Sequence, residues 1–228
     1  MKLESWPSNG PSALEFPPVS IAASHQGTQT SKIDGAASSG LGRFLLGSGG
    51  VRLSFAWGFA EATLFFIVPD VWLSLVAIFS VRRLWRHLAA TIAGAVAGGA
   101  LIFLWAQTNP NFALAVVRKV PFVTEQMFVH VDVSFQTRGI AAVYLGPLTG
   151  TPYKIYAVAA PRFVPFASFL FATIPARGWR FVLICLFSAA CAAVLRKYRK
   201  ASLRELTRWH GLAWTAFYIF YWTRMVTG

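Results

Sequence analysis

The chain has 228 residues, a net charge of +13 and a mean hydropathy of +0.54; 56% of its residues are apolar and 13% are charged. A soluble domain carries roughly 25% charged residues, so this composition excludes an ordinary soluble enzyme and predicts an integral membrane protein. The positive charge does not indicate a nucleic-acid partner, because the basic residues flank apolar segments, as they do on the cytoplasmic side of membrane proteins.

Residues 1–42 differ from the rest of the chain. They are rich in Ser, Gly, Ala and Pro and contain few large apolar residues. Such a segment cannot bury enough apolar surface to offset the entropy cost of ordering it. It also lacks a basic stretch followed directly by an apolar one, as a secretory signal would have. We predict a disordered leader over 1–42 and a membrane-embedded domain over 43–228.

The first apolar segment, 53–81, is interrupted in its middle. Pro69 removes a backbone donor and disfavours helix at Val68, and the acids Glu61 and Asp70 lie on either side of the break. Backbone freed from helical bonding inside a membrane must be buried in protein or line a wet cavity. We predict a re-entrant hairpin over about 51–81 that turns near Pro69; a kinked transmembrane helix is the alternative.

Two later segments are predicted to cross the bilayer. Residues 88–106 are uncharged and have the length that a hydrocarbon core of about 30 Å requires. Gly94 and Gly98 form a pair of small residues that lets a neighbouring helix approach closely. The other crossing, 163–195, is long and is interrupted at IPARGWR.

Between these crossings, the segment 139–160 is also interrupted. Its breaking residues are Gly146, Pro147, Gly150 and Pro152. This density of Gly and Pro makes a continuous helix unfavourable. We predict a second hairpin over 139–160 that turns through 146–152, and we expect the two breaks to meet near the membrane midplane.

Basic residues predict the orientation. They are concentrated in 82–87 and 196–208, whereas 107–138 carries few of them and these are offset by acids. The positive-inside rule then places the first two segments in the cytoplasm and the third outside. A hairpin and a spanning helix are thus followed by the same unit inverted, a pattern typical of inverted-repeat transporters. An aromatic helix over 211–226 ends the chain and either spans the membrane or lies on its surface.

Five ionisable residues are candidates for a substrate or ion site: Glu61, Asp70, Lys154, Arg177 and Arg180. A charge at bilayer depth costs about 2.5–3.5 kcal/mol on insertion scales, so we expect the two acids to face an internal polar site and contact one of these cations. For four of the residues a structural alternative stays open. Asp70 could cap the returning helix, Lys154 could snorkel to the outer surface, and the arginines could mark a helix end beside Pro175 and Gly178.

Enzymatic signatures are missing from the sequence. It contains no nucleophile elbow, no HExxH and no P-loop. Its four histidines do not occur at metal-ligand spacings. We therefore expect no catalytic residues, no metal and no cofactor.

The run FAEATLFFIVPDVWLSLVAIFS resembles the first hairpin of the DedA family, also called the VTT or SNARE-associated Golgi protein family, and is most similar to its YqaA-like branch. VPFASFLFATIPARGWRF resembles the helix that follows the family's second hairpin. The family's acids correspond to Glu61 and Asp70. Its paired arginines in the second hairpin have no clear counterpart, because YLGPLTGTPYK offers only Lys154.

The resemblance implies two opposed re-entrant hairpins in a small helical bundle at the bacterial inner membrane. It implies a flippase or scramblase that moves phospholipid or polyprenyl-phosphate headgroups, with coupling to an ion such as a proton. A homo-oligomer is compatible with it. Two other functions remain open, a secondary transporter of a small ion or solute and a membrane scaffold whose charges merely pair.

Overall fold

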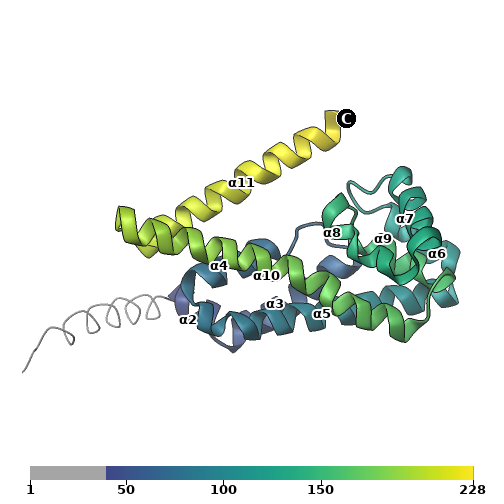
Figure 1. Ribbon diagram of the computed structural model, residues 1–228, viewed down its shortest axis with the longest axis horizontal. Helices are drawn as coiled ribbons and strands as arrows, with labels where there is room; N and C mark the ends of the chain where they lie inside the picture. The colour runs from purple at the N-terminus through teal and green to yellow at the C-terminus, as the bar shows by residue number, and fades with distance from the viewer. Residues whose placement is uncertain (1–39, 228) are drawn as a thin grey trace, which may run out of the picture. The chain divides into compact units, whose positions relative to one another are not determined.

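The computed structural model describes residues 40–227, and all regular structure within them is helical (Figure 1). The predicted leader lies outside these residues except for Gly40–Gly42. These three residues open the helix α2, so the predicted boundary at residue 42 falls inside a helix.

The helices follow one another along the chain with short connections. In order they are α2 (Gly40–Leu46), α3 (Ser48–Thr63), α4 (Asp70–Phe79), α5 (Val81–Thr108), α6 (Pro110–Arg118), α7 (Glu125–Arg138), the 3₁₀ helix η1 (Gly139–Tyr144), α8 (Gly146–Thr149), α9 (Tyr153–Ala159), the 3₁₀ helix η2 (Ala160–Arg162), α10 (Phe166–Arg199) and α11 (Leu203–Thr227).

Within the described residues, α5 and α10 are the two helices that are long and apolar enough to cross a membrane. The 28 residues of α5 extend over about 42 Å at 1.5 Å per residue. This helix includes the predicted span 88–106 but begins earlier. Ser80 is its N-cap and accepts a hydrogen bond from Arg83 N at 3.4 Å, so the basic residues 82–87 form its first turns instead of a separate connector.

Small residues set the spacing between α3 and α5. A Cβ atom on Gly94 would collide with the backbone of Phe55 and lie 2.9 Å from Phe59 N. Gly98 is equally restricted, since its Cβ would lie 2.8 Å from Phe59 O. The prediction that these glycines admit a close helix neighbour is therefore confirmed, and α3 is that neighbour.

The first predicted break is present. Helix α3 ends at Thr63 and α4 begins at Asp70, so the residues 64–69 leave the helix altogether. A kinked continuous helix is thus wrong for this segment. Pro69 stands at the N-cap of α4 and makes no side-chain cap, and Trp57 Nε1 donates to Ile67 O at 3.0 Å, which satisfies one carbonyl of the broken segment.

The second predicted break is also present but is built differently from a simple hairpin. The entering limb is the 3₁₀ helix η1 followed by the single turn α8, which contains Pro147. Gly150 then adopts a left-handed conformation with φ of 72°, which glycine reaches without steric cost. Pro152 precedes α9, the returning limb.

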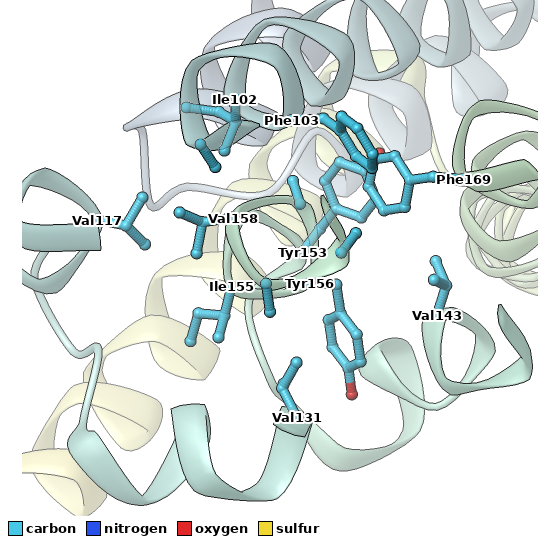
Figure 2. Packing of buried hydrophobic residues seen from close by; sticks show 14 of the residues in the cluster. Ile102, Phe103, Val117, Val131, Val143, Tyr153, Ile155, Tyr156, Val158 and Phe169 are labelled. Carbon is cyan, nitrogen blue, oxygen red and sulfur yellow. The ribbon is translucent and has the colours of Figure 1, made fainter. Parts of the chain in front are cut away.

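Helix α9 lies at the centre of the largest hydrophobic core, and every one of its residues is buried. Figure 2 shows Tyr153, Ile155, Tyr156 and Val158 pointing outward from it in different directions. They meet side chains of five other elements, represented by Ile102 and Phe103 (α5), Val117 (α6), Val131 (α7), Val143 (η1) and Phe169 (α10). A seven-residue helix is too short to be stable alone in water, so this packing is what holds it.

Helix α10 runs without interruption from Phe166 to Arg199, with Pro175 inside it. The predicted interruption at IPARGWR is therefore wrong, and Arg177 and Arg180 do not mark a helix end. Proline is tolerated within an apolar helix when packed neighbours compensate for the freed backbone group. Because the helix continues, Arg177 and Arg180 are held on a rigid scaffold.

Two further elements differ from the sequence-based expectation. The segment 107–138, expected only as an external connector, contains α6 and α7. Helix α11 begins at Leu203, eight residues before the predicted aromatic helix. Its start is fixed by a reciprocal capping box, in which Glu205 N donates to Ser202 Oγ at 3.3 Å and Ser202 N donates to the Glu205 carboxylate at 2.6 Å.

Candidate functional site

A buried ion pair joins α3 to α10. The Arg177 guanidinium donates to Glu61 Oε2, and both residues are buried, with exposures of 4% and 5%. Arg177 also lies 5.1 Å from the ring centroids of Tyr153 and Phe181, within cation–π distance of both. Glu61 therefore has the cationic partner expected from the sequence, and that partner is fixed by rings on two sides.

A second pair joins α4 to α10, one turn further along. Arg180 Nη2 lies 2.8 Å from Asp70 Oδ2, in an orientation that does not complete a hydrogen bond. Asp70 is the first residue of α4 and is 4% exposed. The N-cap position belongs to Pro69, so Asp70 is not the cap; its charge still complements the positive end of the helix dipole.

Lys154 is the third cation of this region. It is 2% exposed, and its Nζ donates to Phe65 O at 2.8 Å. Snorkelling to the surface is therefore wrong for Lys154, because α9 is enclosed on all sides. The hydrogen bond joins the two breaks directly, since Phe65 lies in the first and Lys154 follows the second.

A cavity of about 100 Å³ lies beside these pairs, and Asp70 is not among the residues that line it. Its lining includes Phe66 and Val68 from the first break and Gly146, Gly150 and Pro152 from the second. Glu61, Lys154, Arg177 and Arg180 also line it. The two broken segments thus lie beside each other around this cavity, and residues far apart in sequence form one site. That they meet near the membrane midplane stays a prediction.

The cavity carries more hydrogen-bond donors than the protein uses. Among residues 40–227, the Nε atoms of Arg177 and Arg180 donate to no acceptor, and Arg180 Nη2 makes no hydrogen bond. Lys154 donates to one backbone carbonyl, and its ammonium has three N–H groups. The ionisable residues of this region are three bases, Lys154, Arg177 and Arg180, and two acids, Glu61 and Asp70. This excess of positive charge and of free N–H groups suits an anion with several acceptor oxygens.

An aromatic cluster closes one side of the cavity, and no sequence motif indicates it. Phe122, from the connector between α6 and α7, stacks on Trp222 of α11 at 6.2 Å with an interplanar angle of 7°. Phe66 also contacts both rings. Phe122 has φ of 66°, a left-handed conformation that is rare for a bulky residue. Such strain persists only where surrounding contacts hold it, and here the stacked rings do so.

A scan against protein-family models, a search of curated proteins and a search of solved structures each find no match to this chain. The resemblance to the DedA family therefore stays a prediction that depends on its sequence motifs. Within the described residues no group of His, Cys, Asp or Glu side chains could hold a metal ion. The function is accordingly inferred from the cavity itself.

Proposed function

We propose that this chain is a multi-pass protein of the bacterial inner membrane, of the DedA class, that moves lipids with a phosphate-bearing headgroup between leaflets. The observation that carries the proposal is the cavity between the two broken segments, which is lined by the buried Lys154 and Arg177, the partly exposed Arg180 and one acid, Glu61, and around which several N–H groups have no protein acceptor. Phosphate oxygens satisfy planar guanidinium donors and an ammonium better than most small anions do.

The outer face of α10 supports placement in a bilayer. Large apolar side chains project from it into the surroundings, among them Phe171, Leu183 and Phe187, with exposures of 74%, 56% and 66%. A water-soluble protein rarely exposes such a row of apolar side chains. In this proposal the row faces lipid, and α5 and α10 are the spanning helices.

In the proposed membrane arrangement, the segments around α3–α4 and η1–α9 are opposed re-entrant hairpins related as an inverted repeat. Both breaks contain backbone outside regular helix, which a bilayer tolerates only where protein or water surrounds it. Both line the cavity, which supports a site at the interface between two repeats. The basic segments 82–87 and 196–208 lie in the cytoplasm and α6–α7 outside.

The mechanism follows from competition for Arg177. A phosphate entering the cavity offers its oxygens to the arginines and to Lys154, and Glu61 then loses part of its positive partner. A buried carboxylate without a partner is costly, so headgroup binding is coupled to the state of the Glu61–Arg177 pair.

Reconstitution tests the proposal. The full chain is placed in vesicles that contain a fluorescent phospholipid, and transfer is followed by quenching of the outer leaflet. We expect faster transfer with the wild-type chain and with the control Glu125→Gln, whose surface pair with Arg118 is exposed, and basal transfer with Glu61→Gln. Inserted wild-type protein that moves no phospholipid would refute the proposal.

A second candidate, the scaffold, is favoured by the fact that both carboxylates are already paired. It predicts that Glu61→Gln lowers stability and that no variant, the wild type included, accelerates transfer. A secondary transporter of a small ion predicts flux of that ion with no phospholipid transfer in the same vesicles.

A further inference from the structure

Beside the polar cavity lies a larger groove of about 740 Å³ between α3, α4 and α11. Its volume falls within the roughly 300–1,000 Å³ of ligand-binding pockets, whereas the cavity of about 100 Å³ has room for a headgroup's phosphate but not for a whole lipid. The groove is walled by residues such as Leu53, Ala60, Val71 and Ile219. An amphiphile bound in the cavity therefore needs a second space for its chain.

The aromatic residues of the groove turn their polar atoms away from it. Trp57 Nε1 donates to Ile67 O at 3.0 Å, and Trp214 Nε1 donates to Ser74 Oγ at 3.1 Å. Tyr218 Oη accepts a hydrogen bond from Val68 N at 3.1 Å. These rings thus present their carbon faces to the groove while their polar atoms are bonded to the protein, an arrangement that favours a hydrocarbon over a polar ligand.

The groove and the cavity share a wall. In the segment between α3 and α4, Phe65 and Ile67 line the groove, whereas Phe66 and Val68 line the cavity. This segment therefore separates the two spaces. Trp222 lines both spaces, and its Nε1 is buried and donates to no acceptor in the described part of the chain.

Polar contacts hold α11 in place as the outer wall of the groove. Ser74 Oγ accepts a hydrogen bond from Trp214 Nε1 at 3.1 Å and lies within hydrogen-bond distance, 2.8 Å, of His210 Nε2. Together with the Tyr218–Val68 hydrogen bond, these contacts attach α11 to α4 and to the first break. The groove is therefore preformed between attached helices.

We propose that the groove between α3, α4 and α11 binds one hydrocarbon chain of a phospholipid while the anionic headgroup of the same molecule occupies the cavity, with Trp222 at the junction. The occupant is assigned from the bonded polar atoms of Trp57, Trp214 and Tyr218 and from the adjacency of the groove to a site of excess positive charge, with Trp222 lining both spaces. Only the headgroup part of this inference rests on the proposed function. Binding of the hydrocarbon chain in the groove is measured separately.

Photo-labelling tests the chain site in vesicles. The probe is a phosphatidylglycerol with a diazirine on one acyl chain, and labelled peptides of the full chain are identified by mass spectrometry. We expect labelling of α3 and α11 at groove residues. Ala60→Phe places a ring in the groove and should lower that labelling at least about tenfold, because several buried methylene groups are displaced, each worth about 0.8 kcal/mol.

The matched control is Ala190→Phe, on an exposed face of α10, which should leave groove labelling unchanged. A diacylglycerol with the same diazirine chain should label the groove less than the phosphatidylglycerol, because it lacks the charge that the cavity binds. Circular dichroism of each variant confirms that the helices are retained.

Equal groove labelling in Ala60→Phe and wild type would overturn the proposal, and so would equal labelling by the two probes. An unlabelled groove together with loss of a dimer in Ala60→Phe would also overturn it, because the occupant of the groove would then be a second copy of the protein. Groove labelling without lipid transfer would refute the proposed function but not the binding of a hydrocarbon chain in the groove. Lipid transfer without groove labelling would refute that binding but not the proposed function.

Discussion

The pair between Glu61 and Arg177 permits the sharpest test, because its two possible roles have different energetic signatures. Glu61→Gln keeps the shape of the side chain but removes its charge, which leaves the 4% exposed Arg177 without a counter-charge. Breaking a buried pair by removing one partner costs about 3–5 kcal/mol. An exposed pair contributes only about 0–1 kcal/mol, and Arg118–Glu125, with side-chain exposures of 45% and 69%, is such a pair.

The measurement is the free energy of unfolding in mixed micelles, by SDS titration followed by circular dichroism. We expect Glu61→Gln to lose at least about 2 kcal/mol more than the control Glu125→Gln. The double variant Glu61→Gln/Arg177→Met removes both charges and should recover most of the loss, since apolar replacements of a whole buried pair are often neutral or stabilising.

Transfer assays on the same proteins separate structure from function. If the pair serves transport, the double variant regains stability and still moves no lipid. A double variant that is stable and active would show that the pair is only structural. Equal stabilities for Glu61→Gln and Glu125→Gln would contradict the burial argument itself.

Three further predictions follow from other parts of the molecule. Gly94→Ala should destabilise the protein by about 1–3 kcal/mol through overpacking against α3. Its control is Gly211→Ala, whose Cβ meets nothing within 4 Å and which should be neutral or stabilising by up to about 1 kcal/mol. The same SDS titration compares the two variants, and a neutral Gly94→Ala would be inconsistent with the close α3–α5 contact. In a Cys191→Ala background, cysteines placed at residues 125 and 199 should react with an impermeant maleimide from opposite sides of sealed vesicles; reaction from one side would disprove the orientation. The backbone N–H of Ser202 donates to Glu205 and lowers the pKa of its carboxyl, so the capping contribution is complete above the unfolded-state pKa and is lost as pH falls through the lower folded-state pKa. Amide exchange in the first turn of α11 should therefore accelerate at that acid pH. Glu205→Gln, which can still accept the hydrogen bond, should remove the pH dependence.

The positions of the breaks were determined by local sequence. Pro69, Gly150 and Pro152 remove donors or favour non-helical backbone whatever surrounds them. Residues 64–69 and 150–152 lie outside helix in the structure, whereas Gly146–Thr149 form the helical turn α8. The possibility of a close helix neighbour at Gly94 was likewise evident from the sequence, because glycine has no side chain. That this neighbour is α3 depends on the packing of the helices. The candidate ionisable residues were also evident, since a charge in an apolar segment requires a partner.

Which partner each charge takes was decided by tertiary structure. Arg177 and Arg180 are three residues apart on one helix, and nothing in the sequence assigns the first to Glu61 and the second to Asp70; the packing of α10 against α3 and α4 does so. The sequence likewise placed an interruption at Pro175, whereas the packed neighbours of α10 keep that helix continuous. Lys154 could have reached the surface had α9 been exposed, and its burial follows from five elements packed around a helix too short to stand alone.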